Sequence, residues 1–132
     1  MIFLADIPEL TIVGVADRGI PNQERVVIRI NQDVDLAQFQ MFLVVYQEGV
    51  STPVNDYSFW LTDVSVKSGM YIFLYTGVGE VKFTTVQGTN EPAYVLHWGQ
   101  PQAILTDPKF RPAIVRLSGL EVLTEHENLL PS

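Results

Sequence analysis

The sequence lacks cysteine altogether and has only two histidines among its 132 residues. Without cysteine the chain has no disulfide, no thiolate zinc site and no cysteine nucleophile. The two histidines, His97 and His126, do not form the His-x-x-x-His spacing of a metal pair. We therefore expect no metal and no cofactor bound through these residue types.

Positive charge is also scarce, with eight Lys and Arg against fifteen Asp and Glu and a net charge of −7. The eight basic residues are spread along the chain and form no dense run. Because proteins bind phosphate backbones chiefly through Lys and Arg, this composition argues against a nucleic-acid partner. The same argument disfavours an anionic membrane surface.

Long apolar runs are missing as well. No stretch approaches the ~20 apolar residues of a membrane-spanning helix, and residues 1–4 are not preceded by the basic start of a secretory leader. We expect a soluble chain with no signal peptide and no membrane insertion, with the cytoplasm slightly favoured among compartments. The hydrophobic content of 47% is enough for one packed core without a structural metal.

Short apolar runs separated by Gly, Pro, Asn and Asp are abundant. Val, Ile, Thr, Tyr and Phe dominate these runs, which is typical of β-strands. In residues 25–31, Val26, Ile28 and Ile30 alternate with the two arginines, as in a strand with one buried face. The strands predicted in this way are 9–16, 25–31, 39–46, 57–61, 70–75, 81–86, 94–98, 113–117 and 121–123.

Helical spacing is limited to one or two turns in residues 33–43, capped by Asp33 or Asp35, and to another turn near the C-terminus. Seven to nine short antiparallel strands predict a β-sandwich or barrel. We expect a single domain in residues 1–123, followed by a C-terminal tail in residues 124–132.

The segment Gly77-Val78-Gly79 follows a strongly apolar run and raises the question of a phosphate-binding loop. A dinucleotide fingerprint needs a third glycine where Lys82 stands, and a helix must follow it. A strand-like run follows instead. We therefore predict a connection between two strands.

A second motif, formed by Asn31, Asp33 and Asp35, begins like a calcium loop. Leu36 and Phe42 occupy the positions at which that loop needs glycine and glutamate. A polar turn at the end of a strand is the better interpretation, although a calcium site of another design stays open.

No catalytic constellation is apparent. The Gly-x-Ser-x-Gly nucleophile elbow is absent. His97 stands beside Trp98 in a predicted strand, where one of the two faces the core and the other faces out. We predict a protein that is not an enzyme. A small hydrolase or metal enzyme that depends on His97 stays open as a further alternative.

Three stretches, taken in order, resemble the lamin tail domain family. These are NQERVVIRINQDVDL from Asn22, SGMYIFLYTGVGE from Ser68, and LHWGQPQAILTDPKFRPAIVRLSG from Leu96. The resemblance implies an immunoglobulin-like β-sandwich. It also implies a binding or tethering module without catalytic residues, in which the glycine-rich segment closes a strand.

These observations together predict a non-enzymatic protein-interaction or assembly module that binds a protein partner or itself, as a subunit of a larger complex. The candidate contact residues are Tyr57 and Trp60 in an aromatic cluster, and Leu129 and Leu130 in the tail. The alternative is a carbohydrate-binding module, in which exposed aromatics around residues 57–60 stack on a glycan.

Overall fold

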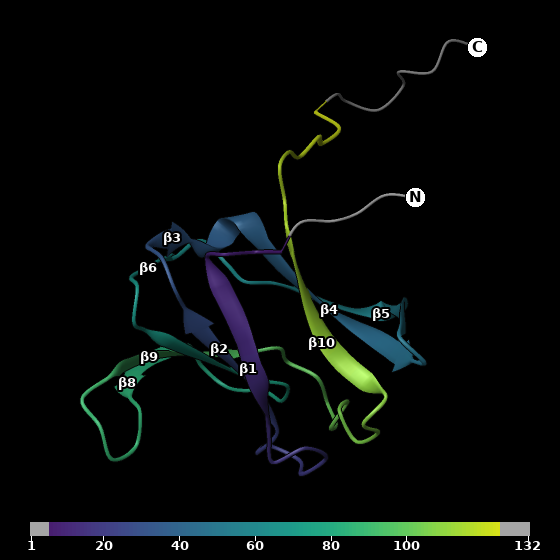
Figure 1. The fold of residues 1–132 in the computed structure, drawn as a ribbon, viewed down its shortest axis with the longest axis horizontal. Coiled ribbons are helices and arrows are strands. Elements are labelled where there is room, and N and C mark those ends of the chain that lie inside the picture. The colour runs from purple at the N-terminus through teal and green to yellow at the C-terminus, as the bar shows by residue number, and fades with distance from the viewer. Residues whose placement is uncertain (1–5, 125–132) are drawn as a thin grey trace.

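The computed structural model describes residues 6–124 (Figure 1). Within that range the chain forms ten β-strands and one short 3-10 helix, η1, and contains no α-helix. In chain order these elements are β1 (Leu10–Ala16), β2 (Arg25–Ile30), β3 (Val34–Asp35), η1 (Leu36–Gln38), β4 (Phe39–Gln47), β5 (Val50–Trp60), β6 (Ser65–Val66), β7 (Tyr71–Tyr75), β8 (Lys82–Thr85), β9 (Pro92–His97) and β10 (Phe110–Arg116). The all-β prediction is confirmed. No helix among these residues has the length and apolar character to cross a membrane.

The strands are arranged in three sheets. One has five strands in the order β1-β2-β7-β9-β8, a second has three in the order β10-β4-β5, and β3 pairs with β6 alone. The prediction of a purely antiparallel fold with seven to nine strands was wrong. β7 and β9 run parallel, so the largest sheet is mixed, and two short strands add to the total.

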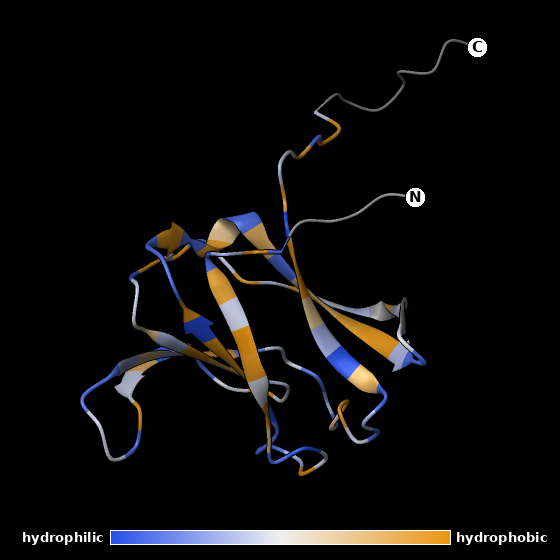
Figure 2. Cartoon of the chain, in the orientation of Figure 1, coloured by the Kyte–Doolittle hydropathy of each residue, from blue (hydrophilic) through white to orange (hydrophobic). Residues whose placement is uncertain are grey.

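Buried side chains from the two larger sheets meet in one hydrophobic core. Val26, Ile28 and Ile30 are fully buried, which confirms the alternation predicted for β2. Figure 2 shows that β1 and β10 each contain both apolar and more polar residues. The fully buried side chains that the three-stranded sheet contributes are Phe39, Met41 and Leu43.

The largest error in the predicted boundaries concerns residues 47–56, which were expected to be a connection. Glu48 and Gly49 have φ of 53° and 81°, and they close a tight hairpin between Gln47 and Val50. The chain therefore continues as a strand straight after the turn. Pro53 lies within it because β5 is at the edge of its sheet, where a missing N–H is tolerated.

Two further differences are found towards the C-terminus. β10 begins at Phe110, three residues before the strand predicted at 113–117. Residues 121–123, which were expected to form a strand, have no regular structure. Exposure explains this difference, because Val122 and Leu123 are 61% and 81% exposed and have no sheet face to pack against.

Candidate functional site

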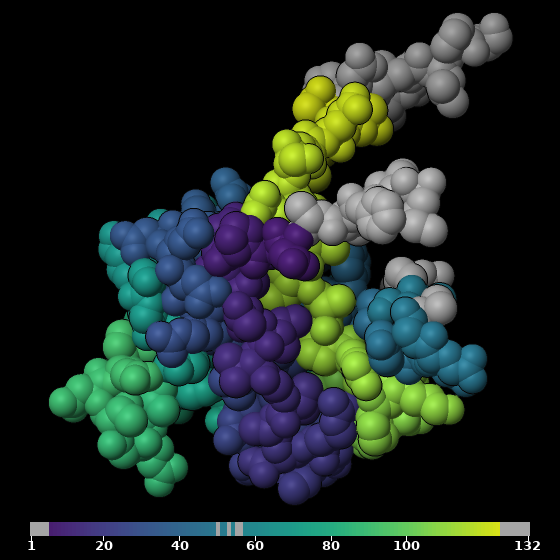
Figure 3. Space-filling view, viewed as in Figure 1, coloured from purple at the N-terminus to yellow at the C-terminus, as the bar shows by residue number. Residues whose placement is uncertain are grey.

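A groove lies between β1 and β10, which are edge strands of different sheets. The two strands lie on the same side of the molecule, in purple and yellow-green (Figure 3). The groove has a volume of about 860 Å³. Its walls are formed by Asp6, Ile7, Leu10, Thr11, Ile12, Ile114, Val115, Arg116 and Ser118.

Three consecutive residues of each strand border this groove. Successive side chains of a strand point to opposite faces, so a groove that meets all three must be bordered by the strand's backbone edge. Leu10 is buried, and Ile7, Ile12 and Ile114 pack against the core, so the floor is apolar. The groove thus combines backbone hydrogen-bonding groups with apolar side chains.

On β1 the hydrogen-bond pattern shows which backbone groups are open. The N–H of Asn31 donates to the carbonyl of Glu9 at 2.8 Å, which places Glu9 in a hydrogen-bonded pair with β2. In an antiparallel ladder such pairs alternate along the strand, so Leu10 and Ile12 direct their N–H and C=O away from β2. The ladder shifts register after Ile12, and the bulge there ends the regular edge.

The same alternation applies to β10. The N–H of Leu117 donates to the carbonyl of Gln38 at 2.6 Å, so Leu117 belongs to the pairs that face β4. Ile114 and Arg116 therefore direct their backbone groups away from β4, towards the groove. Pro112 also faces away from β4, so its missing N–H removes no hydrogen bond from the ladder.

Arginines connect the two edges at both ends of the groove. Arg116 forms an ion pair with Glu9 at one end. At the other end Nη1 of Arg18 donates to the carbonyls of Phe110 at 2.9 Å, Leu105 at 3.1 Å and Asp107 at 3.3 Å. These bridges hold β1 and β10 near one another without a direct strand pairing, so the groove is held open along its middle.

The structure separates the two aromatic candidate residues. Tyr57 is half-buried and packs against the core, whereas Trp60 is 51% exposed. They are three residues apart in β5, an odd spacing that places them on opposite faces. Nε1 of Trp60 donates to the carbonyl of Ala37 at 2.9 Å, which fixes the indole ring at the surface. The other two candidates, Leu129 and Leu130, lie outside the described residues.

The glycine segment connects β7 to β8, as predicted. Gly79 lies directly against the ring of His97: a Cβ at this position would stand 2.3 Å from Cε1. The His97 ring also stacks on Tyr75, with ring centroids 5.3 Å apart. Glycine is thus required for close packing of the backbone on a side chain, and no phosphate is needed to explain it.

His97 itself is half-buried, while its neighbour Trp98 is buried, which confirms that the two face opposite ways. Burial, and then the nearby charge of Lys82, lowers the pKa of His97 below 6.5, although the Gly77 carbonyl opposes this shift. The buried Nδ1 has no hydrogen-bond partner among the described residues. No carboxylate is hydrogen-bonded to this ring in the described chain. The described residues therefore do not form the histidine–carboxylate pair of a catalytic triad around His97.

The carboxylates of the calcium-like motif have structural contacts. Oδ1 of Asp33 accepts from the N–H of Ser68 at 2.9 Å, and Lys67 lies 3.6 Å away; these contacts lower the pKa of Asp33, the Ser68 bond most. Asp35 caps η1 by accepting from the N–H of Ala37 at 2.9 Å, as predicted. Residues 6–124 contain no cluster of three His, Asp or Glu side chains that would hold a metal ion.

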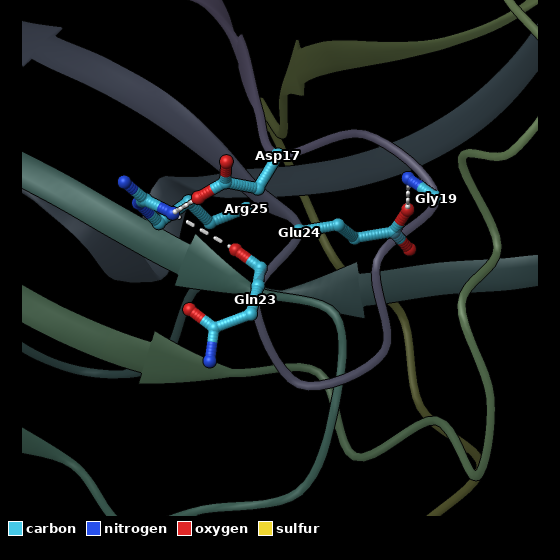
Figure 4. A network of polar contacts seen from close by, with 5 residues as sticks. All are labelled: Asp17, Gly19, Gln23, Glu24 and Arg25. Atoms are coloured by element: carbon cyan, nitrogen blue, oxygen red, sulfur yellow. Dashed lines mark hydrogen bonds and ion pairs between the residues drawn. The ribbon is translucent and has the colours of Figure 1, made fainter.

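Sequence reasoning missed the role of Glu24, although this residue lies in the first of the three stretches that carry the family resemblance. The Glu24 side chain is 1% exposed and accepts hydrogen bonds from four groups. The donors are the N–H of Gly19 at 2.8 Å, the hydroxyl of Thr76 at 2.6 Å, and the N–H groups of Ile104 at 2.7 Å and Leu105 at 3.1 Å. In Figure 4 Glu24 points towards Gly19, and Arg25 points the other way to Asp17.

Comparison with known proteins adds no further assignment, since the chain matches no family model, no curated protein and no solved structure. The lamin tail resemblance therefore stays a prediction based on the three quoted stretches.

Proposed function

We propose that this chain is a non-enzymatic protein-interaction module that accepts an extended segment of a partner protein in the groove between β1 and β10. The observation that carries the proposal is the outward N–H and C=O groups of Leu10, Ile12, Ile114 and Arg116 on two edges that border one groove. An added strand satisfies such groups, and pockets for its alternate side chains supply specificity.

The floor of the groove favours a partner segment with alternating apolar residues. Ile7, Ile12 and Ile114 line it, while Asp6 and Arg116 stand at its margin. Every second side chain of an inserted strand faces such a floor. Because an unpaired sheet edge also invites association with other chains, a partner strand protects the module. This mode of binding suits a subunit of a larger complex.

We also propose that the fold is an immunoglobulin-like β-sandwich of the lamin tail kind. Two observations support this. Residues of the five-stranded and three-stranded sheets share one core, and the glycine-rich segment at Gly77–Gly79 closes β7, as the family resemblance implies. The parallel pairing of β7 with β9 differs from the antiparallel pairing expected of such a sandwich.

The proposal is tested by placing a proline at an outward-facing position of the groove. Ile114→Pro removes an N–H that faces the groove and leaves the ladder with β4 intact. We expect peptides selected from a displayed random library to bind the wild-type chain. Ile114→Pro should weaken the binding of these peptides about tenfold or more. Calorimetric titration measures the loss.

Thr85→Pro is the matched control, because Thr85 faces outward on β8, the opposite edge of the five-stranded sheet. The affinity of the Thr85→Pro variant for the selected peptides should equal that of the wild-type chain. Amide shifts on peptide binding should appear at Leu10, Ile12 and Ile114. Selected peptides that shift other amides, or that bind both proline variants equally well, would overturn the proposal. Sedimentation of the chain alone shows whether a second copy fills the groove.

A carbohydrate-binding role is the second candidate function, and the 51% exposure of Trp60 is the observation that favours it. An exposed indole stacks on sugar rings. We expect Trp60→Ala to abolish retention on immobilised glycans if this role is correct. Phe83→Ala is the control, since Phe83 is 67% exposed on another strand. Equal retention of both variants, or none by the wild type, would exclude it.

A further inference from the structure

The outer face of the five-stranded sheet carries a row of cationic and aromatic side chains. Arg25 on β2 is opposite Tyr75 on β7, which is opposite His97 on β9. The guanidinium of Arg25 lies 5.5 Å from the centre of the Tyr75 ring, which in turn stacks on His97. The adjacent row, which contains Leu74 and Leu96, is buried in the core. The Arg25 row therefore faces away from the core.

Strand β8 and the turn after it border this row and form a cleft of about 430 Å³. This volume lies within the ~300–1,000 Å³ of small-molecule sites. Phe73, which is half-buried, contributes apolar surface, and hydroxyls and amides contribute hydrogen-bonding groups. The residues around the cleft are Asn22, Arg25, Phe73, Tyr75, Lys82, Thr84, Thr85, Val86, Gln87, Val95 and His97.

The charge of these walls is opposite to that of the whole chain. Acids outnumber bases fifteen to eight in the sequence, yet Arg25 and Lys82 line the cleft and no Asp or Glu does. Asp17 pairs with Arg25 at 2.7 Å and so partly offsets the positive charge of Arg25 at the cleft (Figure 4). Lys82 is exposed and forms no ion pair within the described residues. Burial lowers the pKa of His97 most, and the positive charge of Lys82 lowers it further.

We propose that this cleft binds a small organic anion, whose carboxylate or phosphate oxygens contact Lys82 and Arg25 and whose flat apolar body lies against Phe73. The hydroxyl of Thr84, which is on the same face of β8 as Lys82, and the amide of Asn22 offer further hydrogen bonds to the anion. His97 forms one wall, and its ring contacts both Tyr75 and the backbone of Gly79. The cleft shares no lining residue with the groove between β1 and β10.

The test is a titration of the whole chain with three probes, followed by amide and imidazole NMR shifts. The probes are benzoate, phenyl phosphate and inorganic phosphate, with sodium chloride at matched ionic strength as the reference. We expect saturable shifts at Tyr75, Lys82, Thr84 and His97 with a probe that carries the aromatic ring. Inorganic phosphate should bind more weakly, because it lacks a body to contact Phe73.

Lys82→Gln is expected to weaken binding about tenfold or more, since it removes one charge-assisted contact. Lys67→Gln is the control, because Lys67 is an equally exposed lysine that pairs with Asp33 outside the cleft. The affinity of the Lys67→Gln variant for the aromatic probes should not change. Shifts that sodium chloride reproduces, or an affinity that Lys82→Gln leaves unchanged, would overturn the proposal. Equal affinity for inorganic phosphate and phenyl phosphate would overturn the contact with the apolar body.

Discussion

Glu24→Ala is expected to lower the free energy of unfolding by about 3–5 kcal/mol, which is typical of a buried charged group removed from its partners. The carboxylate accepts from four donors, three of them backbone N–H groups. Alanine leaves these donors buried without an acceptor, and each such group costs about 1–3 kcal/mol. Chemical denaturation followed by tryptophan fluorescence measures the loss.

Glu91→Ala is the control, because Glu91 is an exposed glutamate whose side chain makes no hydrogen bond in the described chain. Its stability should stay within about 0.5 kcal/mol of the wild type. Glu24→Gln separates the contribution of side-chain shape to stability from that of charge. The amide has a similar shape and keeps one acceptor oxygen, but it turns an NH2 group towards the donors. An unfolding free energy for Glu24→Ala equal to that of Glu91→Ala would contradict the proposed role of the carboxylate.

The importance of Glu24 follows from what it connects. Its donors are contributed by the loop before β2, by Thr76 after β7, and by residues 104 and 105 ahead of β10. Arg18, from the same loop, binds the carbonyls of residues 105, 107 and 110. These polar contacts fix the segment that leads into β10. They therefore help to set the width of the groove, which no strand pairing between β1 and β10 determines.

Local features of the fold were predictable because they depend on neighbouring residues. The alternation in β2 follows from side-chain period alone, and the Asp35 cap follows from a short polar side chain next to a turn. The hairpin at Glu48–Gly49 was missed because positive φ at a glutamate is not a sequence signal as clear as Asn-Gly. Once that turn is tight, β5 has to follow.

Features that join distant segments were not predictable from the sequence. Glu24 is 52 residues from Thr76 and 80 from Ile104, so nothing local marks it as a buried acceptor. The groove depends on the order of the strands and on which residues of β1 and β10 face outward, and both are properties of the sheets. The aromatic candidates Tyr57 and Trp60 were grouped by sequence proximity, but an odd spacing in a strand separates them.

The glycine-rich segment illustrates the difference between a motif and its cause. Gly77 and Gly79 look alike in the sequence, but Gly79 is the one that allows the backbone to touch a ring. A Cβ at Gly79 would lie within 2.5 Å of three atoms of His97, whereas at Gly77 the nearest atom would be Oδ1 of Asn22, at 3.1 Å. The requirement for glycine at residue 79 is therefore steric, and it links the β7–β8 connection to the wall of the anion cleft.

Gly79→Ala is accordingly expected to lower the free energy of unfolding by about 1–3 kcal/mol, a cost typical of overpacking. The methyl group has no room unless His97 moves, and movement of His97 would disturb its stacking on Tyr75. The imidazole and Tyr75 ring resonances should shift, and affinity for the aromatic anion should fall because one wall of the cleft is displaced. Thermal unfolding and NMR measure the three effects.

Gly14→Ala is the matched control for this substitution. Gly14 lies in β1, has no positive φ and would bring its Cβ within 4 Å of no atom. Alanine is compatible there, so the free energy of unfolding should stay the same or rise by about 0.4–1 kcal/mol. If Gly79→Ala behaved like Gly14→Ala and left the His97 resonances in place, the close contact would be absent. The glycine would then serve only the turn between β7 and β8, and the proposed wall of the cleft would lose its support.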